Sequence, residues 1–220
     1  MRSAMSMLEL VFAIVVMGIA VMSLPLILTQ VQTNNTFSLQ QEAILAAKTK
    51  IGDILTYEWD HNSYDVAAQR SFVLTAINGN GDLNCSATTF RRIGHINADY
   101  RRKCSLSGAT ASAIGTDGLD DIDDFNGQAT TITATLEGAG TLDYVFTALT
   151  LTPTITYASD TATYSNTPLN NFTFNPNNVN VRTNIKTIAV TASGGNQNIT
   201  LRTFSCNIGE SSLLPSRPYL

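Results

Sequence analysis

The sequence predicts an α+β protein in which a long N-terminal helix packs its second half on an antiparallel β-sheet head. Two observations predict this fold. Residues 10–28 are apolar without a single charge, and apolar residues then recur at helical spacing as far as residue 56. Beyond Asp60 the spacing changes to the alternation of every second residue that is typical of strands.

The composition of the 220-residue chain excludes some functions. Hydrophobic residues make up 44% of the chain, enough for a buried core, whereas charged residues make up only 14%, against about 25% in an average protein. The net charge of −4 argues against a nucleic-acid partner. We find no phosphate-binding glycine loop, no nucleophile elbow, no HExxH and no CxxC motif. We therefore expect that the protein is not an enzyme.

Residues 10–28 are long enough to cross a membrane. As a helix this segment is about 28 Å long, close to the ~30 Å hydrocarbon thickness of a bilayer. A buried helix of this length would carry a polar stripe, which this segment lacks. The segment is therefore a membrane span or a signal sequence. Glu9 stands at its start, and a carboxylate in a membrane requires a partner because its burial is costly.

The residues that lead to Glu9 resemble a known export signal. The run AMSMLE from Ala4 to Glu9, followed by the apolar segment, is similar to the class III signal of type IV pilins and type II secretion pseudopilins. In that family a small residue is followed by an aromatic residue or Met, three further residues and Glu. Two details differ here. Ala4 replaces the commoner Gly, and Pro25 lies one residue earlier than the helix proline of many pilins.

This resemblance implies a route of processing and assembly. A prepilin peptidase would cleave between Ala4 and Met5, which would become an N-methylated amino terminus. Glu9 would pair with the terminal amine of a neighbouring subunit as the helices bundle in the filament core. The resemblance also implies the ladle shape of pilins, with a leader 1–4, a membrane and filament-core helix 5–28, an amphipathic helix 29–56 and a β-rich globular head 57–220.

The second half of the predicted helix is amphipathic. Its apolar residues recur at three- and four-residue spacing and predict the face that packs on the head: Leu39, Ala43, Ala46, Ala47, Ile51, Ile54 and Leu55. Pro25 predicts a kink or a locally melted turn in the first half.

Several segments of the head read as strands. Residues 184–192 and 198–206 predict a hairpin around Ser-Gly-Gly-Asn at 193–196. The other predicted strands are 72–77, 130–136, 142–157 and a short strand at Phe172 and Phe174. Pro153 interrupts the pattern of 142–157 and predicts an edge strand or a bend there.

Three cysteines lie after the apolar segment: Cys85, Cys104 and Cys206. We predict a Cys85–Cys104 disulfide, which would close a loop rich in arginine and contribute about 3 kcal/mol. Pairing of either cysteine with Cys206 stays open, since spacing does not fix connectivity. The remaining cysteine would be buried as a small apolar residue.

The run DGLDDIDDFNG at 117–127 holds four closely spaced aspartates: Asp120, Asp121, Asp123 and Asp124. Such carboxylates repel one another unless a cation or an arginine neutralises them. They predict either a Ca²⁺ site, since Ca²⁺ prefers oxygen ligands, or a solvated loop or salt-bridge surface. The run also resembles the DDVDDY-type motif of minor pilins of the mannose-sensitive haemagglutinin pilus, with Asn126 where His is expected.

A basic pair, Arg91-Arg92, and a basic triplet, Arg101 to Lys103, stand near His95 and Tyr100. They suit either a phosphate-binding patch or a partner for the acidic run, and the negative net charge favours the second. The cluster Tyr57, Trp59, His61 and Tyr64 predicts a cap on the junction of helix and head.

These observations lead us to expect a minor pilin-like structural subunit of a type IV pilus or a related filament, with other pilin subunits as partners. The chain would cross the inner membrane once with its head in the periplasm. After assembly it would lie in an extracellular pilus or a periplasmic pseudopilus. The alternative of the same class is a type II secretion pseudopilin. The alternative of another class is a surface adhesin or DNA-binding pilus-tip module.

Overall fold

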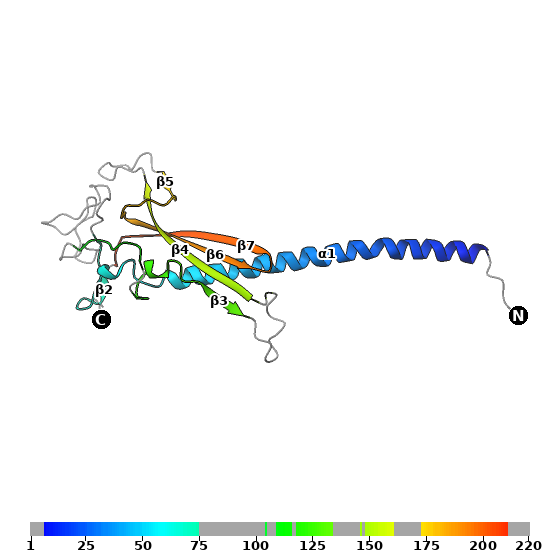
Figure 1. Ribbon diagram of the computed structural model, residues 1–220, viewed down its shortest axis with the longest axis horizontal. Helices are drawn as coiled ribbons and strands as arrows, with labels where there is room; N and C mark the ends of the chain where they lie inside the picture. Colours follow the sequence, from blue (N-terminus) through cyan, green and yellow to red (C-terminus); the bar gives the residue numbers. More distant parts are fainter. Residues whose placement is uncertain are drawn as a thin grey trace, which may run out of the picture.

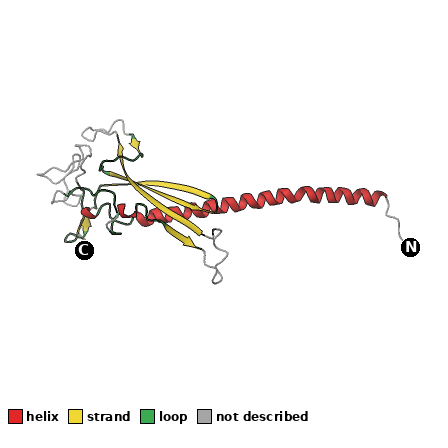
Figure 2. Ribbon diagram, viewed as in Figure 1, coloured by secondary structure: helices red, strands yellow, loops and turns green. Residues whose placement is uncertain are grey.

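The protein is α+β, with one long apolar N-terminal helix and an antiparallel sheet (Figures 1 and 2). The computed structural model describes residues 7–74, 104, 109–115, 118–133, 146, 148–160 and 173–210. The elements in chain order are α1 (Met7–Ile54), η1 (His61–Ser63), β1 (Tyr64–Asp65), β2 (Arg70–Ser71), η3 (Asp123–Phe125), β3 (Thr130–Thr133), β4 (Ala148–Asp160), β5 (Phe174–Asn175), β6 (Ile185–Gly194) and β7 (Gln197–Cys206).

The helix α1 has two halves with different surroundings. Its 48 residues span about 72 Å at about 1.5 Å per residue. Residues 7–38 are all exposed, and this half projects away from the sheet (Figure 1). The helix continues through Pro25, so the predicted melted turn is absent. A proline removes only one backbone hydrogen bond, and here the Thr29 hydroxyl additionally donates to the Pro25 carbonyl at 2.8 Å.

The second half of α1 packs on the sheet through the face that the sequence predicts. Ala43, Ala47 and Ile54 are fully buried, and Leu39 lies against the same core. The two alanines have no bulk beyond Cβ, so the helix can approach β6 and β7 closely. The expectation that Leu55 packs on the head is wrong: its side chain is 43% exposed, because it points about 100° around the helix axis from the buried Ile54.

The main sheet has the order β3-β4-β6-β7, and β5 pairs with the far end of β4. All of these pairings are antiparallel. The predicted hairpin is confirmed as β6 and β7, joined by a two-residue turn at Gly195 and Asn196 with φ of 51° and 61°. Two consecutive positive φ values are typical of the turn whose twist matches the flanking strands.

Pro153 lies inside β4, where it pairs with Val190 of β6. β4 as a whole is not an edge strand, since it has β6 on one side and β3 on the other. At Pro153 itself, however, the side towards β3 is open, as the predicted edge position requires. β3 begins at Thr130, opposite Leu151, and so does not reach Pro153. Beyond that point the Pro153 carbonyl accepts from the backbone N–H of Gly127 at 2.9 Å. The missing N–H of Pro153 faces this side, where no ladder continues.

The sheet has an apolar and a polar face. On β6 the side chains of Ile188, Val190 and Ala192 are buried and face α1, whereas Thr187 and Thr191, at the alternate positions, face outward. Threonine hydroxyls pair across the strands on the outer face, at Thr131–Thr150, Thr156–Thr187 and Thr191–Thr200. Uncharged hydroxyl groups thus make this face polar, which accounts in part for the low share of charged residues in the chain.

Candidate functional site

The exposed half of α1 is the first candidate site. α1 is the one helix among the described residues that is long and apolar enough to cross a membrane: an 18-residue stretch of it has a mean hydropathy of 2.7, and none of that stretch is buried. By length and composition such a helix is a membrane span or a signal sequence. Glu9 lies in its first turn, where the positive end of the helix dipole favours a carboxylate. Ala4 and Met5, the predicted processing residues, lie outside the described residues.

A cluster of buried charges at the junction of α1 and the sheet is the second candidate site. It comprises Lys186 on β6 and the carboxylates of Asp60, Asp121, Asp123 and Asp124. We call these five residues the buried cluster. All five side chains are 0–1% exposed. Burial of a charge is costly unless the charge is paired and hydrogen-bonded, so the partners of each group decide what the site can do.

Asp60 holds the start of the short helix η1. Its Oδ1 accepts from the backbone N–H of Asn62 at 3.1 Å, as an N-cap aspartate does. Its Oδ2 accepts from both the backbone N–H and the hydroxyl of Ser112, at 2.8 and 2.9 Å. Asp60 therefore ties the segment after α1 to the segment before η3.

The aspartates of the acidic run bind backbone groups of their own loop. Asp121 Oδ1 accepts from the N–H groups of Asp123 and Asp124, at 2.7 and 3.4 Å. Asp124 Oδ2 accepts from the N–H groups of Asp120 and Asp121, at 3.0 and 3.2 Å. These bonds satisfy donors at the start of η3, where short acidic side chains are favourable. The density of aspartates thus has a local structural role.

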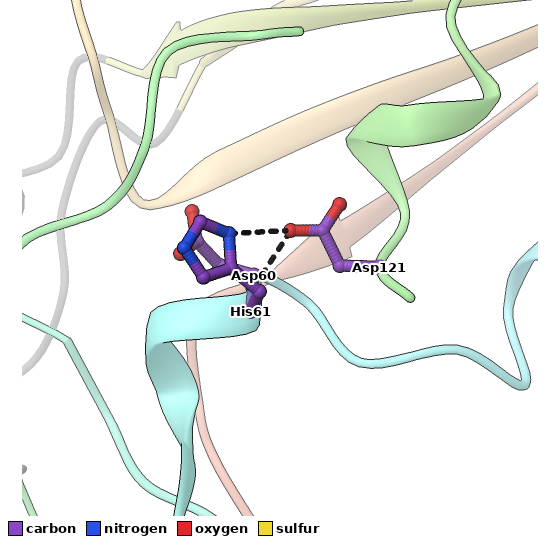
Figure 3. Close-up of side chains that lie close together, drawn as sticks. All are labelled: Asp60, His61 and Asp121. Atoms are coloured by element: carbon purple, nitrogen blue, oxygen red, sulfur yellow. Dashed lines mark hydrogen bonds and ion pairs between the residues drawn. The ribbon is translucent and has the colours of Figure 1, made fainter. Parts of the chain in front are cut away.

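Asp121 also reaches across to η1 (Figure 3). Its Oδ2 accepts from the backbone N–H of His61 at 2.7 Å and lies 3.8 Å from Nδ1 of the His61 ring. Burial raises the pKa of Asp121 to about 7, with a contribution from the neighbouring Asp123 carboxyl, and the Lys186 charge opposes this shift. Asp121 can therefore gain or lose a proton near neutral pH.

Lys186 places its ammonium group among these carboxylates. Nζ donates to the Trp59 carbonyl at 2.6 Å and to Asp123 Oδ2 at 2.8 Å, and lies 3.4 Å from Asp60 Oδ2. The Trp59 ring centroid lies 4.5 Å from Nζ and that of Tyr157 lies 5.7 Å away. The three donors of the ammonium group thus have acceptors inside an aromatic wall.

Asp123 is less well bonded than Asp60. Its Oδ2 accepts from Lys186 and from the Ser112 hydroxyl, the latter at 3.2 Å. Its Oδ1 is buried and has no hydrogen-bond partner among the described residues. A buried carboxylate oxygen that no donor satisfies is energetically unfavourable.

The aspartate run is not the solvated loop of one sequence hypothesis, since Asp121, Asp123 and Asp124 are buried. Carboxylate oxygens of Asp120, Asp121 and Asp124 lie within 4.8 Å of one another, as do ligand atoms of Asp60, His61 and Asp121. Asp123 faces Lys186 instead. The calcium site with Asp120, Asp121, Asp123 and Asp124 as ligands stays a prediction.

Sequence reasoning missed Lys186 and Asp60. A signal for Lys186 was present, because it has the same strand phase as the buried residues Ile188 and Val190. A charged residue at a core-facing strand position indicates a buried partner. The basic residues at 91–92 and 101–103, which the sequence suggested as partners of the acidic run, lie outside the described residues.

Cys104 is buried and disulfide-bonded. Its backbone pairs with that of Val73 in an isolated parallel β-bridge. Its predicted partner Cys85 lies outside the described residues. Cys206, at the end of β7, is half-buried and carries a thiol. Of the aromatic residues expected at the junction, Trp59 is buried in the core, whereas Tyr64 is 43% exposed.

No family model, curated protein or solved structure matches the chain. The fold and the geometry of the two candidate sites are therefore the observations on which a function can be proposed.

Proposed function

We propose that the protein is a minor pilin-like subunit of a type IV pilus or a related envelope filament. The observation that carries this proposal is the division of α1 into a packed half and an exposed apolar half. Residues 7–38 lie outside the head and contain a single ionisable side chain, Glu9. The apolar surface of residues 7–28 is stable only in a lipid bilayer or against other apolar helices.

Both environments occur in turn in a pilin-like route. A subunit in the inner membrane buries residues 7–28 in lipid, and a subunit in a filament buries them against the helices of its neighbours. Glu9 is costly in either environment unless a cation pairs with it. The amino group of Met5, generated by cleavage after Ala4, would supply that cation from a neighbouring subunit. The packed half of α1 would then hold the head on the filament surface.

Mass spectrometry of the mature amino-terminal peptide tests the proposal. The chain would be expressed in hosts with and without a prepilin peptidase, and the peptide would be measured in each. We expect a peptide that starts at N-methylated Met5, only in the host that has the enzyme. A chain that keeps Met1 in both hosts, or that starts near Val21, would overturn the proposal.

A deletion of the gene in its native host separates the two kinds of filament. Loss of surface pili with normal protein secretion supports the pilus subunit. Loss of secretion with normal pili assigns the chain to the type II secretion pseudopilins instead, which use the same processing route.

A further inference from the structure

We propose that the side chains of Lys186 and Asp123 become joined by an amide bond, which the protein forms by itself inside its folded head. This inference concerns the head alone and does not depend on the proposed filament. It rests on three observations at one place: a short contact between an amine and a carboxyl group, their complete burial, and a carboxylate oxygen without a partner.

The contact has the geometry of a pair that can react. Nζ of Lys186 lies 2.8 Å from Oδ2 of Asp123, and the two side chains are 0% and 1% exposed. This distance puts the amine in direct contact with the carboxyl group that it would attack, so the two groups need no encounter step. The strand β6 and the helix η3 hold both groups, so neither side chain needs to move far.

Asp123 is a better acceptor for this reaction than Asp60. Asp60 Oδ2 lies farther from Nζ, at 3.4 Å, and both Asp60 oxygens accept hydrogen bonds from backbone N–H groups. Those bonds stabilise the carboxylate against attack. Oδ1 of Asp123 has no such bond among the described residues. The Asp123 carboxylate is therefore the one whose conversion to an amide relieves an unfavourable buried charge, because an amide carries no charge.

The reaction balances without an external reagent. The ammonium group and the carboxylate hold three protons between them, all on Nζ. One proton stays on Nζ as the amide N–H, and two leave with one carboxylate oxygen as a water molecule. The new bond joins Nζ to the Asp123 carboxyl carbon, and no atom is oxidised or reduced. The amide N–H would keep the hydrogen bond to the Trp59 carbonyl, which now lies 2.6 Å from Nζ.

Asp60 and Ser112 form a path for the protons. The Ser112 hydroxyl lies 2.9 Å from Asp60 Oδ2 and 3.2 Å from Asp123 Oδ2, and thus bridges the two carboxylates. Asp60 would accept a proton as Nζ attacks, and Ser112 would pass a proton to the leaving oxygen. The Tyr157 hydroxyl donates to the Ser112 carbonyl at 2.6 Å and fixes this bridge.

The surroundings favour the neutral product. The Trp59 and Tyr157 rings lie over Nζ and exclude water, so the two charges are expensive to maintain there. The exposed pair Lys50 and Asp53 has almost the same N–O distance, 2.9 Å, but its side chains are 16% and 49% exposed. That pair keeps its hydration, and no amide is expected there. It serves as the internal control.

The amide would have a mechanical consequence for the head. Lys186 and Asp123 are 63 positions apart in the sequence. A covalent bond between them would fasten the η3 loop to the central strand β6 and close a long loop. Closing a long loop restricts the unfolded chain, as a disulfide does, and unlike a disulfide an amide resists reduction.

Mass spectrometry of the full-length chain in detergent, after reduction of disulfides, tests the proposal. We expect the mature wild-type chain to be lighter than its sequence by one water molecule. Trypsin should fail to cleave after Lys186 in the denatured chain, and the peptide that contains Lys186 should stay joined to the one that contains Asp123. Cleavage after Lys50 should be complete. An unmodified mass with complete cleavage after Lys186 overturns the proposal, and this measurement requires no variant.

Variants then test the assignment of the atoms. Asp123→Asn should react with loss of ammonia in place of water, because its amide nitrogen leaves. Lys186→Met should have the mass of its sequence. Asp60→Asn should accumulate unreacted chain whose mass is unmodified. A wild-type level of cross-link in Asp60→Asn would remove Asp60 from the mechanism, and a cross-link in Lys186→Met would overturn the proposal.

Discussion

Lys186 and Asp123 approach each other to 2.8 Å in the centre of the head although 63 positions separate them in the sequence. Lys186 belongs to the central strand β6, and Asp123 begins the short helix η3 in a loop that has little regular structure. The contact therefore fastens the loop to the sheet. The loop in turn covers the C-terminal end of α1, since the Phe125 ring lies 4.8 Å from the Tyr57 ring and belongs to the same buried core as Ile54 and Trp59.

Lys186→Met should strongly destabilise the head. The substitution keeps the apolar length of the side chain but leaves the buried Asp60 and Asp123 carboxyl groups without Nζ as a partner, whether Nζ is an ammonium group or an amide nitrogen. Removing one partner of a buried pair costs about 3–5 kcal/mol. The measurement is the midpoint of thermal unfolding of the full-length chain in detergent. Lys50→Met is the matched control, because its pair with Asp53 is exposed and is worth less than about 1 kcal/mol.

The double variant Lys186→Met with Asp123→Leu should recover much of this loss. It removes both charges and fills the space with apolar groups, which is often neutral or stabilising in buried pairs. Equal midpoints for Lys186→Met and the wild type would mean that the contact between Lys186 and Asp123 carries no stability, contrary to its short distance and complete burial.

Asp121 should make the stability of the head depend on pH. Burial and the Asp123 carboxyl raise its pKa to about 7 in the folded protein, whereas its ordinary value in an unfolded chain is about 4. Between these values the folded protein binds a proton that the unfolded chain releases. The stabilising contribution is therefore complete below about pH 4 and is lost as the pH rises towards about 7. The unfolding midpoint should fall over this window and then level.

Asp121→Asn should flatten this part of the pH profile, because the side chain no longer titrates. His61→Gln removes the neighbouring imidazole and keeps Asp121, so it should retain the slope. If the slope survives in Asp121→Asn and vanishes in His61→Gln, the pH dependence comes from His61, and the prediction for Asp121 is wrong.

The parts of the fold that the sequence predicts are those with local patterns. The 3.6-residue spacing of Leu39, Ala43 and Ala47 identifies the packed face of α1, and two alternating runs around Gly195-Asn196 identify the hairpin. Each of these patterns lies within about twenty residues of sequence. That β4 is nevertheless an inner strand, with its side towards β3 open only beyond Leu151, depends on where another strand, β3, begins, and no local pattern around Pro153 shows this.

The buried cluster could be predicted only in part, for the same physical reason. The aspartates of the acidic run are conspicuous in the sequence, but their environment depends on Lys186 and Asp60, which are 126 positions apart. Repulsion among four carboxylates predicts that a cation is needed and does not say which one. The strand phase of Lys186 was the available indication that this lysine is buried.

Gly195→Val should destabilise the hairpin. The backbone of Gly195 has a φ of 51°, and a Cβ there would lie 2.9 Å from the Phe146 ring. Left-handed backbone in a residue with a side chain costs roughly 1–2 kcal/mol, and the steric contact adds to this cost. Gly52→Ala is the matched control: it lies in α1 with nothing within 4 Å of a Cβ, so it should stabilise by up to about 1 kcal/mol. A Gly195→Val chain with the wild-type unfolding midpoint would contradict the positive φ.

Glu9→Gln should abolish incorporation of the subunit into filaments while it leaves processing and the head intact. If the carboxylate pairs with the amine of Met5 in a neighbouring subunit, the neutral amide leaves that amine without a counter-charge in an apolar bundle, which is strongly unfavourable. The measurement is the amount of the subunit in sheared filaments relative to the membrane fraction. Glu42→Gln makes the same change on the same helix, where Glu42 accepts from the Phe146 backbone inside the head. It should leave incorporation near the wild-type level. Equal incorporation of both variants would show that Glu9 has no pairing role and would leave the apolar surface of α1 as the sole basis of assembly.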